Sequence, residues 1–267
     1  MKAVKITAWQ QTASYRKPSS LRMKETFPLP PYSTVIGMVH AICGFKNYVP
    51  MKVSVQGSYG SIISDLYTKY EFVSCSPKEV DRANLIFKEK EGQIRLHAVD
   101  KQLLPGEDGD DWIKTCMNRG IGNIELLTEV RLILHIVPDD QNQINEIERG
   151  LNNPLRFPSL GRHEDLVRFD TIKVVNLSQE PCDRFTLKND AYIPMYYLAP
   201  FPDDAPLGTV YKLNKEFEID QKSGLRRWKE IVLAKHASKN SNISPEFRFF
   251  HDDDFNEDGN GDFVFLA

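Results

Sequence analysis

The sequence has few cysteines, no long apolar run and little excess charge, and each of these absences excludes a class of protein. Its four cysteines form no C-x-x-C pair, which argues against a zinc knuckle and favours reduced, buried thiols. The longest apolar stretch, residues 35–45, is interrupted by glycine and histidine and is shorter than the roughly 20 residues that span a bilayer. The first residues contain no apolar segment of the secretory type. We therefore expect a cytoplasmic protein with no membrane partner.

The composition is that of an ordinary globular protein. The 267 residues are 41% hydrophobic and 27% charged, which excludes collagen-like, mucin-like and wholly disordered chains. This length is sufficient for one large domain or two small ones, and either could bury a substantial core.

The charges are distributed unevenly along the chain. Residues 1–60 contain eight basic residues and one acidic residue, a net charge of +7. The remaining residues contain 26 basic and 36 acidic groups, a net charge of −10. A weakly acidic protein with one basic segment is compatible with a local site for a polyanion, but not with a general nucleic-acid coat. The alternative is chance clustering of basic residues on a solvated face.

Hydrophobic periodicity predicts strands and helices in alternation over the first two-thirds of the chain. In chain order we expect a strand at 4–8, a helix carrying 35–43, a strand from 53 to 72 that bends at Gly57 and Gly60, a strand at 130–136, a helix opened by 138–140 and stopped near Gly150, and a strand at 168–177. Ser33 is a suitable N-cap for the first helix, and Gly44 is a suitable stop.

An insertion interrupts this pattern at about residues 74–122. Charged and apolar residues alternate there, which predicts a protruding hairpin that turns at Glu91 and Gly92. The order β-α-β-insertion-β-α-β predicts an α+β fold of the ferredoxin-like or RNA-recognition type, with an antiparallel sheet and both helices on one face. We therefore expect one domain over 1–177 and a mostly β C-terminal region over 178–267.

Two stretches carry a resemblance to a known family. Residues 27–38 (FPLPPYSTVIGM) form a proline-rich turn that leads into the first helix, and residues 158–166 (PSLGRHEDL) form a glycine-arginine loop before the last strand of the first domain. In this order and spacing, with the insertion between them, the pair resembles the fifth family of CRISPR-associated (Cas) proteins, in the RAMP superfamily. The resemblance covers about residues 1–177. Residues 123–127 resemble the subtype I-B branch.

The resemblance implies a non-catalytic subunit of a type I CRISPR surveillance complex (Cascade), a ribonucleoprotein of antiviral defence. Such a subunit holds the 5′ repeat-derived handle of the CRISPR RNA (crRNA). Its inserted hairpin, the thumb, contacts the backbone subunit and the large subunit, and target DNA is reached through the complex. No cofactor is implied. In the subtype I-C branch the same fold processes precursor RNA, so a metal-independent endoribonuclease is the first alternative, and a protein-only assembly factor is the second.

The residue chemistry gives a set of candidate RNA contacts, and each has a plain structural alternative. Free N–H groups and hydroxyls at the start of the first helix suit a phosphate, and arginine can grip a phosphate or stack on a base. Glycine in the second motif permits close approach of a ligand, and an aromatic ring beside the helix can stack on a base or simply pack there. The candidates are Arg16, Lys17, Arg22, Tyr32, Ser33, Thr34, Gly161, Arg162 and His163. For Arg162 the alternative is an ion pair with Glu164 or Asp165.

No complete catalytic or metal site can be identified in the sequence. The histidines considered as a base for RNA cleavage are His40, His97, His135 and His236. The apolar neighbours of His40 favour a packed helix histidine, and His97 and His135 have no partner recognisable from spacing. His236 forms a local pair with Lys235, but this pair does not match the position that the RNA-processing branch requires. Residues 254–265 follow the first positions of a calcium loop, but Phe265 stands where the bidentate glutamate belongs. We expect no catalytic residue and no metal site, and we interpret the acidic stretch as a surface turn.

Overall fold

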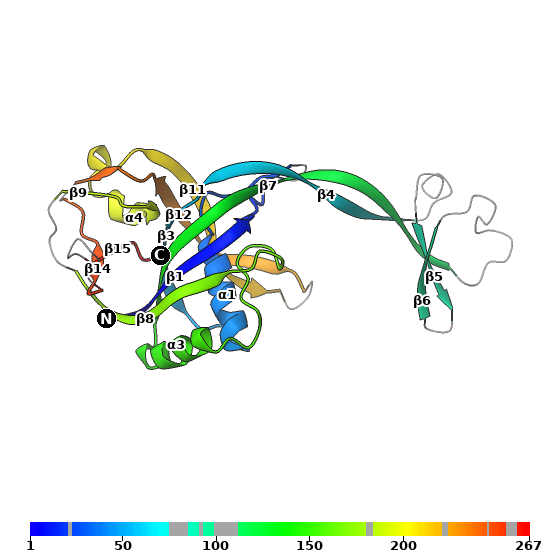
Figure 1. The fold of residues 1–267 in the computed structure, drawn as a ribbon, viewed down its shortest axis with the longest axis horizontal. Coiled ribbons are helices and arrows are strands. Elements are labelled where there is room, and N and C mark those ends of the chain that lie inside the picture. Colours follow the sequence, from blue (N-terminus) through cyan, green and yellow to red (C-terminus); the bar gives the residue numbers. More distant parts are fainter. Residues whose placement is uncertain are drawn as a thin grey trace. The chain divides into compact units, whose positions relative to one another are not determined.

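The structure is a computed structural model of the chain. It describes residues 1–20, 23–74, 85–90, 93–98, 112–179, 184–220, 224–244, 246–254 and 261–267, and within these it describes only the backbone of 71–74, 85–90, 93–98 and 112–118. The chain forms two compact units, which are described separately below (Figure 1). The first unit comprises residues 1–20, 25–63 and 125–267, and the second comprises 21–24 and 64–124.

Four long strands form the centre of the sheet in the first unit. They are β1 (Lys2–Ala13), β3 (Met51–Ser58), β7 (Trp112–Pro138) and β8 (Arg168–Ser178). They lie in the order β3-β7-β1-β8, and every neighbouring pair is antiparallel. Three of the four predicted strands overlap β1, β7 and β8, although β7 begins 18 residues before the predicted start at 130. The predicted bent strand over 53–72 is two strands, β3 and a second one, β4 (Ser61–Ser74), which are separated at residues 59–60.

Two helices follow the predicted order between these strands. They are α1 (Tyr32–Cys43) and α3 (Ile144–Asn152), and a short 3-10 turn, η1 (Gln141–Gln143), precedes α3. Their apolar residues recur at helical spacing and join one core with the sheet, and the two helices contact each other. Gly150 makes this close contact possible, because a Cβ there would lie 2.6 Å from Cys43 Sγ.

The start of α1 differs from the prediction. Pro31, not Ser33, is the N-cap residue, and no side chain caps the helix. Proline fixes φ near the helical value and has no N–H, so it can begin a helix without a capping hydroxyl. The Pro31 carbonyl accepts hydrogen bonds from the N–H groups of Thr34 and Val35. Gly44 ends the helix in a left-handed conformation with φ 71°, as predicted.

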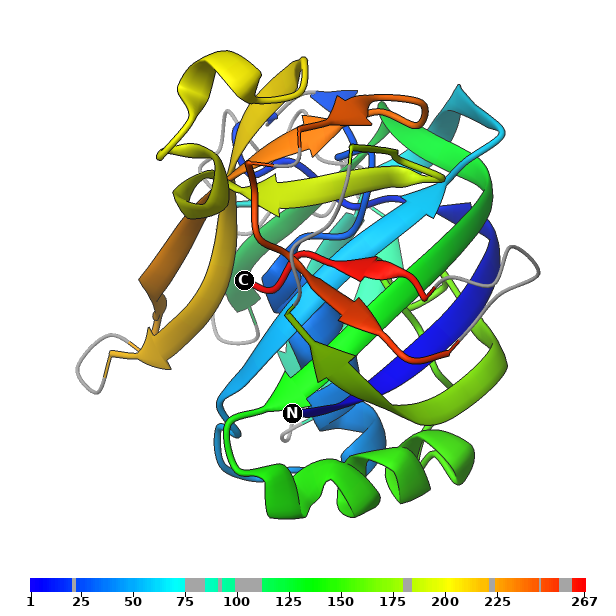
Figure 2. The ribbon, with the colours of Figure 1, turned by 90° about the vertical axis from the view of Figure 1, so that its left-hand side faces the viewer.

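The two faces of the central sheet are covered differently. Residues at alternate positions, such as Val4 opposite Ile136 and Ile6 opposite Leu134, are fully buried in the core that includes the helices. The intervening residues on the other face include Lys5, paired in register with His135. The C-terminal strands β14 (Phe250–Asp252) and β15 (Phe263–Val264) extend the sheet beyond β8, and the chain's last residues pass close to β3 (Figure 2).

Polar contacts attach the C-terminal segment to the centre of the sheet. The Ser54 hydroxyl accepts a hydrogen bond from the Phe265 N–H, and Val53 exchanges two backbone hydrogen bonds with Ala267. The predicted domain boundary at 177/178 is therefore not a boundary of the structure, because residues 178–267 complete the compact unit that residues 1–20 begin. Their predicted β character is confirmed.

The C-terminal region also widens the sheet on its other edge. Its further elements are β9 (Phe185–Thr186), β10 (Asp190–Pro194), α4 (Met195–Leu198), η2 (Pro202–Asp204), β11 (Gly208–Ile219), β12 (Arg226–Ala237) and β13 (Asn242–Ile243). The sheet order continues from β3 through β10 and β12 to β11. β11 and β12 form an antiparallel hairpin, and β11 contacts α1.

In its described residues, the second unit consists of strands. It contains β2 (Met23–Lys24), most of β4 (Ser61–Ser74), β5 (Leu85–Lys90), β6 (Gln93–Ala98) and the first part of β7. β5 and β6 pair antiparallel on either side of residues 91–92, where the hairpin was predicted, while these two residues lie outside the described part of the chain. β4 pairs with β7, and the Lys24 ammonium lies 3.5 Å from the centre of the Tyr67 ring. Within the described residues, no helix has the length and apolar character needed to cross a membrane.

Candidate nucleic-acid interface

The first unit contains a groove of about 830 Å³ beside the amino end of α1. Its walls are formed by the proline-rich turn, α1 and the loop after it, the glycine-arginine loop, and the β11–β12 hairpin. Four candidate RNA contacts line it together: Arg16, Ser33, Thr34 and Gly161. The groove therefore joins the two sequence motifs that carry the family resemblance.

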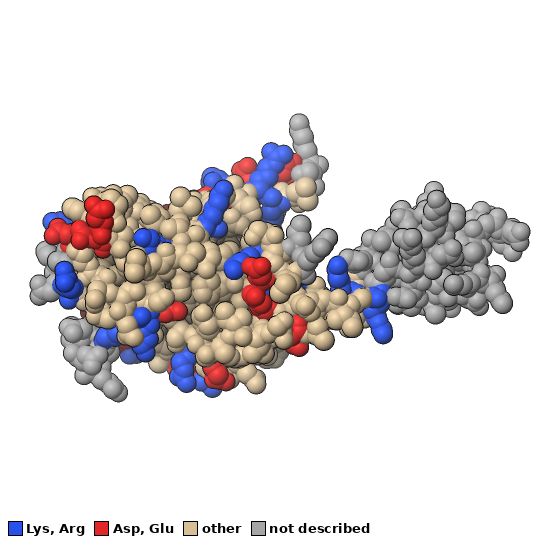
Figure 3. All heavy atoms as spheres, turned by 90° about the horizontal axis from the view of Figure 1, so that it is seen from above, with Lys and Arg blue, Asp and Glu red and all other residues tan. Residues whose placement is uncertain are grey.

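The charged groups of this groove have one sign. Its basic lining residues are Arg16, Lys46, Lys212, Lys215 and Arg226, and none of the described residues that line it is acidic. Lys215 pairs with Glu230 at 3.1 Å, whereas no described carboxylate forms an ion pair with the other four. The face of the molecule in Figure 3 shows basic and acidic side chains interspersed. Four cations without a described ion-pair partner in one groove suit a polyanion.

The start of α1 adds backbone donors to the groove. Ser33 and Thr34 occupy the first turn of a 12-residue helix that has no side-chain cap. The first N–H groups of a helix have no partner within it, and the helix dipole is positive at this end. Because no side chain caps α1, its first N–H groups have fewer hydrogen-bond partners within the protein than the predicted Ser33 cap would give them. The Ser33 hydroxyl is not used in capping.

The glycine-arginine loop is held in place by buried hydrogen bonds. The amide of Gln10 donates to the carbonyls of Leu160 and Asp165, and the Asp165 carboxylate accepts from the Ser14 N–H at 3.0 Å. Gly161 has φ 111°, and a Cβ there would lie 2.9 Å from Asp165 Oδ2. Glycine is needed at this position both for its backbone conformation and for the close approach.

Arg162 and His163 lie in the same loop, but neither lines the groove. The Arg162 guanidinium donates to both oxygens of Asp165, the shortest contact being 2.6 Å, and its other end lies 2.9 Å from Glu164. The ion pair left open in the sequence analysis is therefore formed. His163 is exposed, with Nδ1 2.8 Å from Glu164. An RNA contact by either side chain stays a prediction.

The structure separates the remaining candidates from the groove. Tyr32 is 0% exposed and packs edge-on against Tyr192, so packing, the alternative to base stacking, describes it. A fully buried ring has no face for a base, and the stacking prediction for Tyr32 does not fit this structure. Lys17 pairs with Glu25 at 3.3 Å and is not among the lining residues. Arg22 lies outside the described residues.

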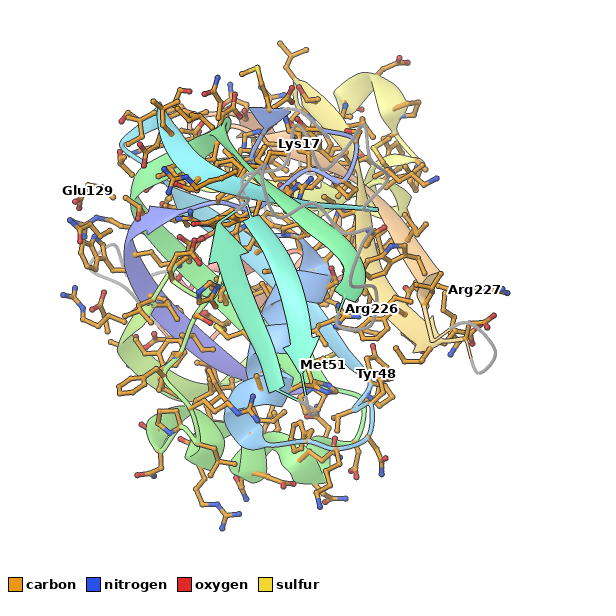
Figure 4. The ribbon with its side chains drawn as sticks, turned by 90° about the vertical axis from the view of Figure 1, so that its right-hand side faces the viewer. Lys17, Tyr48, Met51, Glu129, Arg226 and Arg227 are labelled. Carbon is orange, nitrogen blue, oxygen red and sulfur yellow. The ribbon has the colours of Figure 1, made fainter. Side chains whose placement is uncertain are left out.

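Part of the groove comes from distant segments that were not among the predicted contacts. Tyr48, labelled in Figure 4, follows α1. Phe217 and Trp228 come from the C-terminal β11–β12 hairpin. The signal in the sequence was the run 226–229 (RRWK), in which an aromatic residue lies among basic ones. It was overlooked because nothing local shows that residues 208–237 return to the start of α1.

The candidate bases for RNA cleavage do not gather in the groove. His40 lines it, and burial lowers the pKa of His40, an effect that a hydrogen bond with the Val49 carbonyl partly offsets. The His40 Nε2 lies 3.4 Å from both the backbone nitrogen and oxygen of Val49. His135 is buried beside Asp252, and His236 lies 3.5 Å from Asp190. The side chain of His97 lies outside the described part of the chain.

A lysine occupies the centre of the acidic cluster that resembles a calcium loop. The Lys5 ammonium lies 2.8 Å from Asp252, 3.2 Å from Asp254 and 2.8 Å from Asp262. Residues 255–260 of this loop lie outside the described part of the chain. In the described part, no group of three or more histidine, cysteine or acidic residues is arranged to hold a metal ion.

The fold is shared with a solved CRISPR assembly. A structure described as "CRISPR RNA-guided surveillance complex" aligns with a TM-score of 0.50 and 16% identity, over 90% of this chain and 90% of that chain. A CRISPR protein from Archaeoglobus fulgidus aligns over 94% of this chain and 95% of that chain, with a TM-score of 0.38 and 11% identity. No curated protein matches the sequence.

The sequence itself defines the family. The model of the family described as "CRISPR-associated protein (Cas_Cas5)" matches residues 3–202, about three-quarters of the chain. The chain belongs to this family of CRISPR-associated proteins, and the resemblance seen in the two sequence motifs is confirmed. The matched residues include the proline-rich turn and the glycine-arginine loop, which meet at the groove.

Proposed function

We propose that this protein is a non-catalytic, crRNA-binding subunit of a type I CRISPR surveillance complex, and that the groove beside α1 holds the 5′ repeat-derived handle. In this proposal the four-strand sheet with its two helices is a ferredoxin-like module of the RNA-recognition type. The strand order β8-β1-β7-β3 and the antiparallel pairing support this assignment. Subtype I-B is the branch that the sequence resembles.

One observation carries the proposal: the groove is lined by five basic residues and by none of the described acidic ones. A single-stranded RNA needs phosphate neutralisation and fixed donors, and both are present at the amino end of α1. The volume of about 830 Å³ lies in the range of roughly 300–1,000 Å³ that encloses a small ligand. The groove therefore suits a short single-stranded segment better than a duplex.

The second unit supplies a surface for protein partners. Leu66, Tyr70 and Ile121, on β4 and β7, are all exposed apolar residues. Exposed apolar residues on one element favour a protein-protein contact. We assign this unit, the thumb of the sequence analysis, to contacts with the backbone subunit and the large subunit, through which the complex reaches target DNA in antiviral defence.

The nuclease alternative has weaker support than RNA binding. His40 is the one imidazole among the described lining residues, and its Nε2 is within reach of Val49 backbone atoms. Metal-free cleavage requires a base and an acid around the scissile phosphate. No described side chain that lines the groove forms a hydrogen bond or ion pair with the His40 ring, whose polar contacts are with the Val49 backbone. We therefore propose that another subunit processes the precursor.

The test uses the purified full chain and two labelled RNAs in EDTA: the complete CRISPR repeat and its mature 5′ handle. We expect salt-sensitive binding of the handle and no new fragments on a denaturing gel. Arg16→Ala with Lys46→Ala should weaken binding roughly 10-fold or more and flatten the salt dependence, because each lost phosphate contact removes about 0.7 from the log–log slope. The matched control is Lys17→Ala, which removes a paired lysine outside the groove.

Each alternative has its own signature in this experiment. A discrete cut in the repeat that disappears in a His40→Ala variant would establish the endoribonuclease and overturn the non-catalytic assignment. Equal binding by wild type and the double variant would show that the groove is not the RNA site. No RNA binding by the chain, combined with stable association with the other subunits, would favour the protein-only assembly factor.

A further inference from the structure

We propose that the β11–β12 hairpin is a base-stacking platform, on which Trp228 receives an unpaired nucleobase of the RNA whose phosphates lie toward α1. This inference rests on the proposed function and extends it to residues that neither the sequence motifs nor the family match covers, since the matched segment ends at residue 202. Its ligand class is single-stranded RNA with at least one unstacked base.

The platform is a set of neighbouring side chains on the two strands of the hairpin. Phe217 and Trp228 are paired across the strands, with ring centres 5.9 Å apart and planes at 81°. The Arg226 guanidinium lies 4.5 Å from the centre of the Phe217 ring. Phe217 is thus held between a cation and the Trp228 ring, and this fixes the orientation of the pair.

The position of Trp228 on its strand explains why it faces the groove instead of the core. Val232 and Ala234 of the same strand belong to the buried core. Between them and Trp228 the pairing with β11 shifts its register twice, between Asn214 and Phe217, so the strand does not continue its regular alternation. Trp228 lies beyond these shifts, is 41% exposed and lines the groove.

Tyr48 approaches the hairpin from the loop after α1. It is 38% exposed, lines the same groove, and stacks on His40 with ring centres 5.5 Å apart. Burial, together with the negative charges of Glu216, Glu230 and Asp139, raises the pKa of Tyr48 to about 12, so its hydroxyl is protonated at neutral pH. In Figure 4, Tyr48 and Arg226 lie on the same side of the molecule, and Arg227 points outward at its edge.

The mixture of rings and cations identifies the ligand as nucleic acid. A purely apolar protein partner would not need the unopposed Arg16, Lys46 and Arg226, and an acidic peptide would not need flat aromatic faces. Single-stranded nucleic-acid sites combine a cationic track for the backbone with aromatic rings for the bases, and stacking contributes about 1–3 kcal/mol per base. A base inside a duplex is covered on both faces, so the platform selects an unpaired strand.

The experiment is a double-mutant cycle between Trp228 and the individual bases of the RNA. Wild type and Trp228→Ala are titrated with the intact 5′ handle and with a series of handles that each lack one nucleobase but keep the sugar and phosphate. We expect Trp228→Ala to weaken binding of the intact handle roughly 10-fold, within the range for one stacked base. One abasic handle should bind wild type and variant equally, which identifies the stacked base.

Two controls separate stacking from stability. Trp228→Phe retains a flat ring and should bind within about three-fold of wild type. Leu233→Ala removes an exposed side chain of the same strand that does not line the groove, and it should leave RNA binding unchanged. Thermal unfolding of each variant identifies any loss that comes from folding.

The results distinguish failure of this inference from failure of the proposed function. If wild type and Trp228→Ala bind the intact handle equally and with the same salt dependence, RNA binding stands and the platform is overturned. If Trp228→Ala weakens every abasic handle by the same factor, Trp228 acts through the fold and the platform is also overturned. If wild type binds no RNA, both are overturned.

Discussion

The ammonium group of Lys5, in the middle of β1, lies 2.8 Å from the carboxylate of Asp252, in the C-terminal strand β14. Both side chains are almost fully buried, and His135 reaches the same carboxylate oxygen at 2.8 Å. This ion pair joins the two ends of the chain across the face of the sheet that the helices do not cover. It explains in physical terms why the C-terminal region is part of the first unit.

Removing the lysine of this pair should destabilise the protein strongly. Lys5→Met leaves the carboxylates of Asp252, Asp254 and Asp262 beside one another without their cation. Asp252→Asn should cost less, because Asp254 and Asp262 still lie 3.2 and 2.8 Å from the Lys5 ammonium. Loss of one member of a buried pair costs about 3–5 kcal/mol. Urea unfolding measures the change. Asp170→Asn breaks the exposed pair with Arg168 and is expected to cost less than about 1 kcal/mol. Equal effects of the buried and exposed substitutions would contradict this account.

The same carboxylate should make stability depend on acid pH. Burial by itself raises the pKa of Asp252, but hydrogen bonds from His135 and Lys5 outweigh it and lower the pKa to about 2. Because the folded pKa lies below that of an unfolded aspartate, the stabilisation is complete above about pH 4 and is lost as pH falls toward 2. The difference in unfolding free energy between wild type and Asp252→Asn should narrow by about 2 kcal/mol over this interval. If the difference in unfolding free energy stays constant over this pH interval, folding does not lower the pKa of Asp252.

Calcium should have no effect on the acidic cluster. The Lys5 ammonium contacts three carboxylates, those of Asp252, Asp254 and Asp262. It therefore occupies the position between them that a metal cation would take. We expect the same melting temperature in millimolar calcium and in EDTA. A rise in melting temperature with calcium, abolished by Asp262→Asn, would show that the ion displaces the lysine.

The order of elements in the first unit could be predicted because each has a local signal. Alternating apolar residues marked the centres of the strands, and Gly44 marked the end of α1. The start of α1 was harder to predict, because both Ser33 and Pro31 are residue types favoured at the start of a helix. In the structure, the conformation of the proline-rich turn places the start at Pro31. The early start of β7 was hidden in the insertion, where charged residues interrupt the apolar alternation.

The site could be predicted only in part, because some of its residues lie far apart in the sequence. Arg16, Ser33, Thr34 and Gly161 belong to motifs that a sequence can show. Lys46 and Trp228 come from segments about 180 residues apart. The hairpin returns to α1 through long-range contacts, namely the pairing of β10 with β3 and with β12 and the packing of β11 on α1. The excess of basic residues in 1–60 did not by itself identify the groove. Of these residues, Lys5 forms a buried ion pair with Asp252, whereas Arg16 lines the groove.

Two glycines that line the groove should respond in opposite ways to the same substitution. Gly161→Ala puts a Cβ 2.9 Å from Asp165 Oδ2 and forces alanine into φ 111°, so we expect a loss of about 1–3 kcal/mol and weaker RNA binding as the loop shifts. Gly37 lies within α1, and no described atom would lie within 4 Å of an added Cβ. Gly37→Ala should therefore stabilise the protein by about 0.5–1 kcal/mol. Chemical unfolding measures the stability of each variant, and titration with the handle measures its RNA affinity. Destabilisation by Gly37→Ala would contradict the helix assignment.

Arg162 is expected to act mainly through Asp165. The Asp165 carboxylate is buried and accepts hydrogen bonds from the N–H groups of Ser14 and Arg162 as well as from the Arg162 guanidinium. Arg162→Ala removes the charged donor and should cost about 1.5–3 kcal/mol, the range for a hydrogen bond to a charged group. Arg162→Lys keeps the charge but not the two-pronged geometry, so its cost should be intermediate.

RNA titrations of these Arg162 variants, each corrected for its folded fraction, decide between the two roles of the loop. If Arg162 serves the loop alone, the folded fraction of Arg162→Ala binds the handle as tightly as wild type, because the residue does not line the groove. If the folded fraction of Arg162→Ala loses affinity and about 0.7 of the salt slope, whereas that of Arg162→Lys keeps the slope, the arginine contacts a phosphate directly, as its place in the motif first indicated. The stability and binding measurements must be made on the same samples, since a loop that loosens would weaken RNA binding without any direct contact.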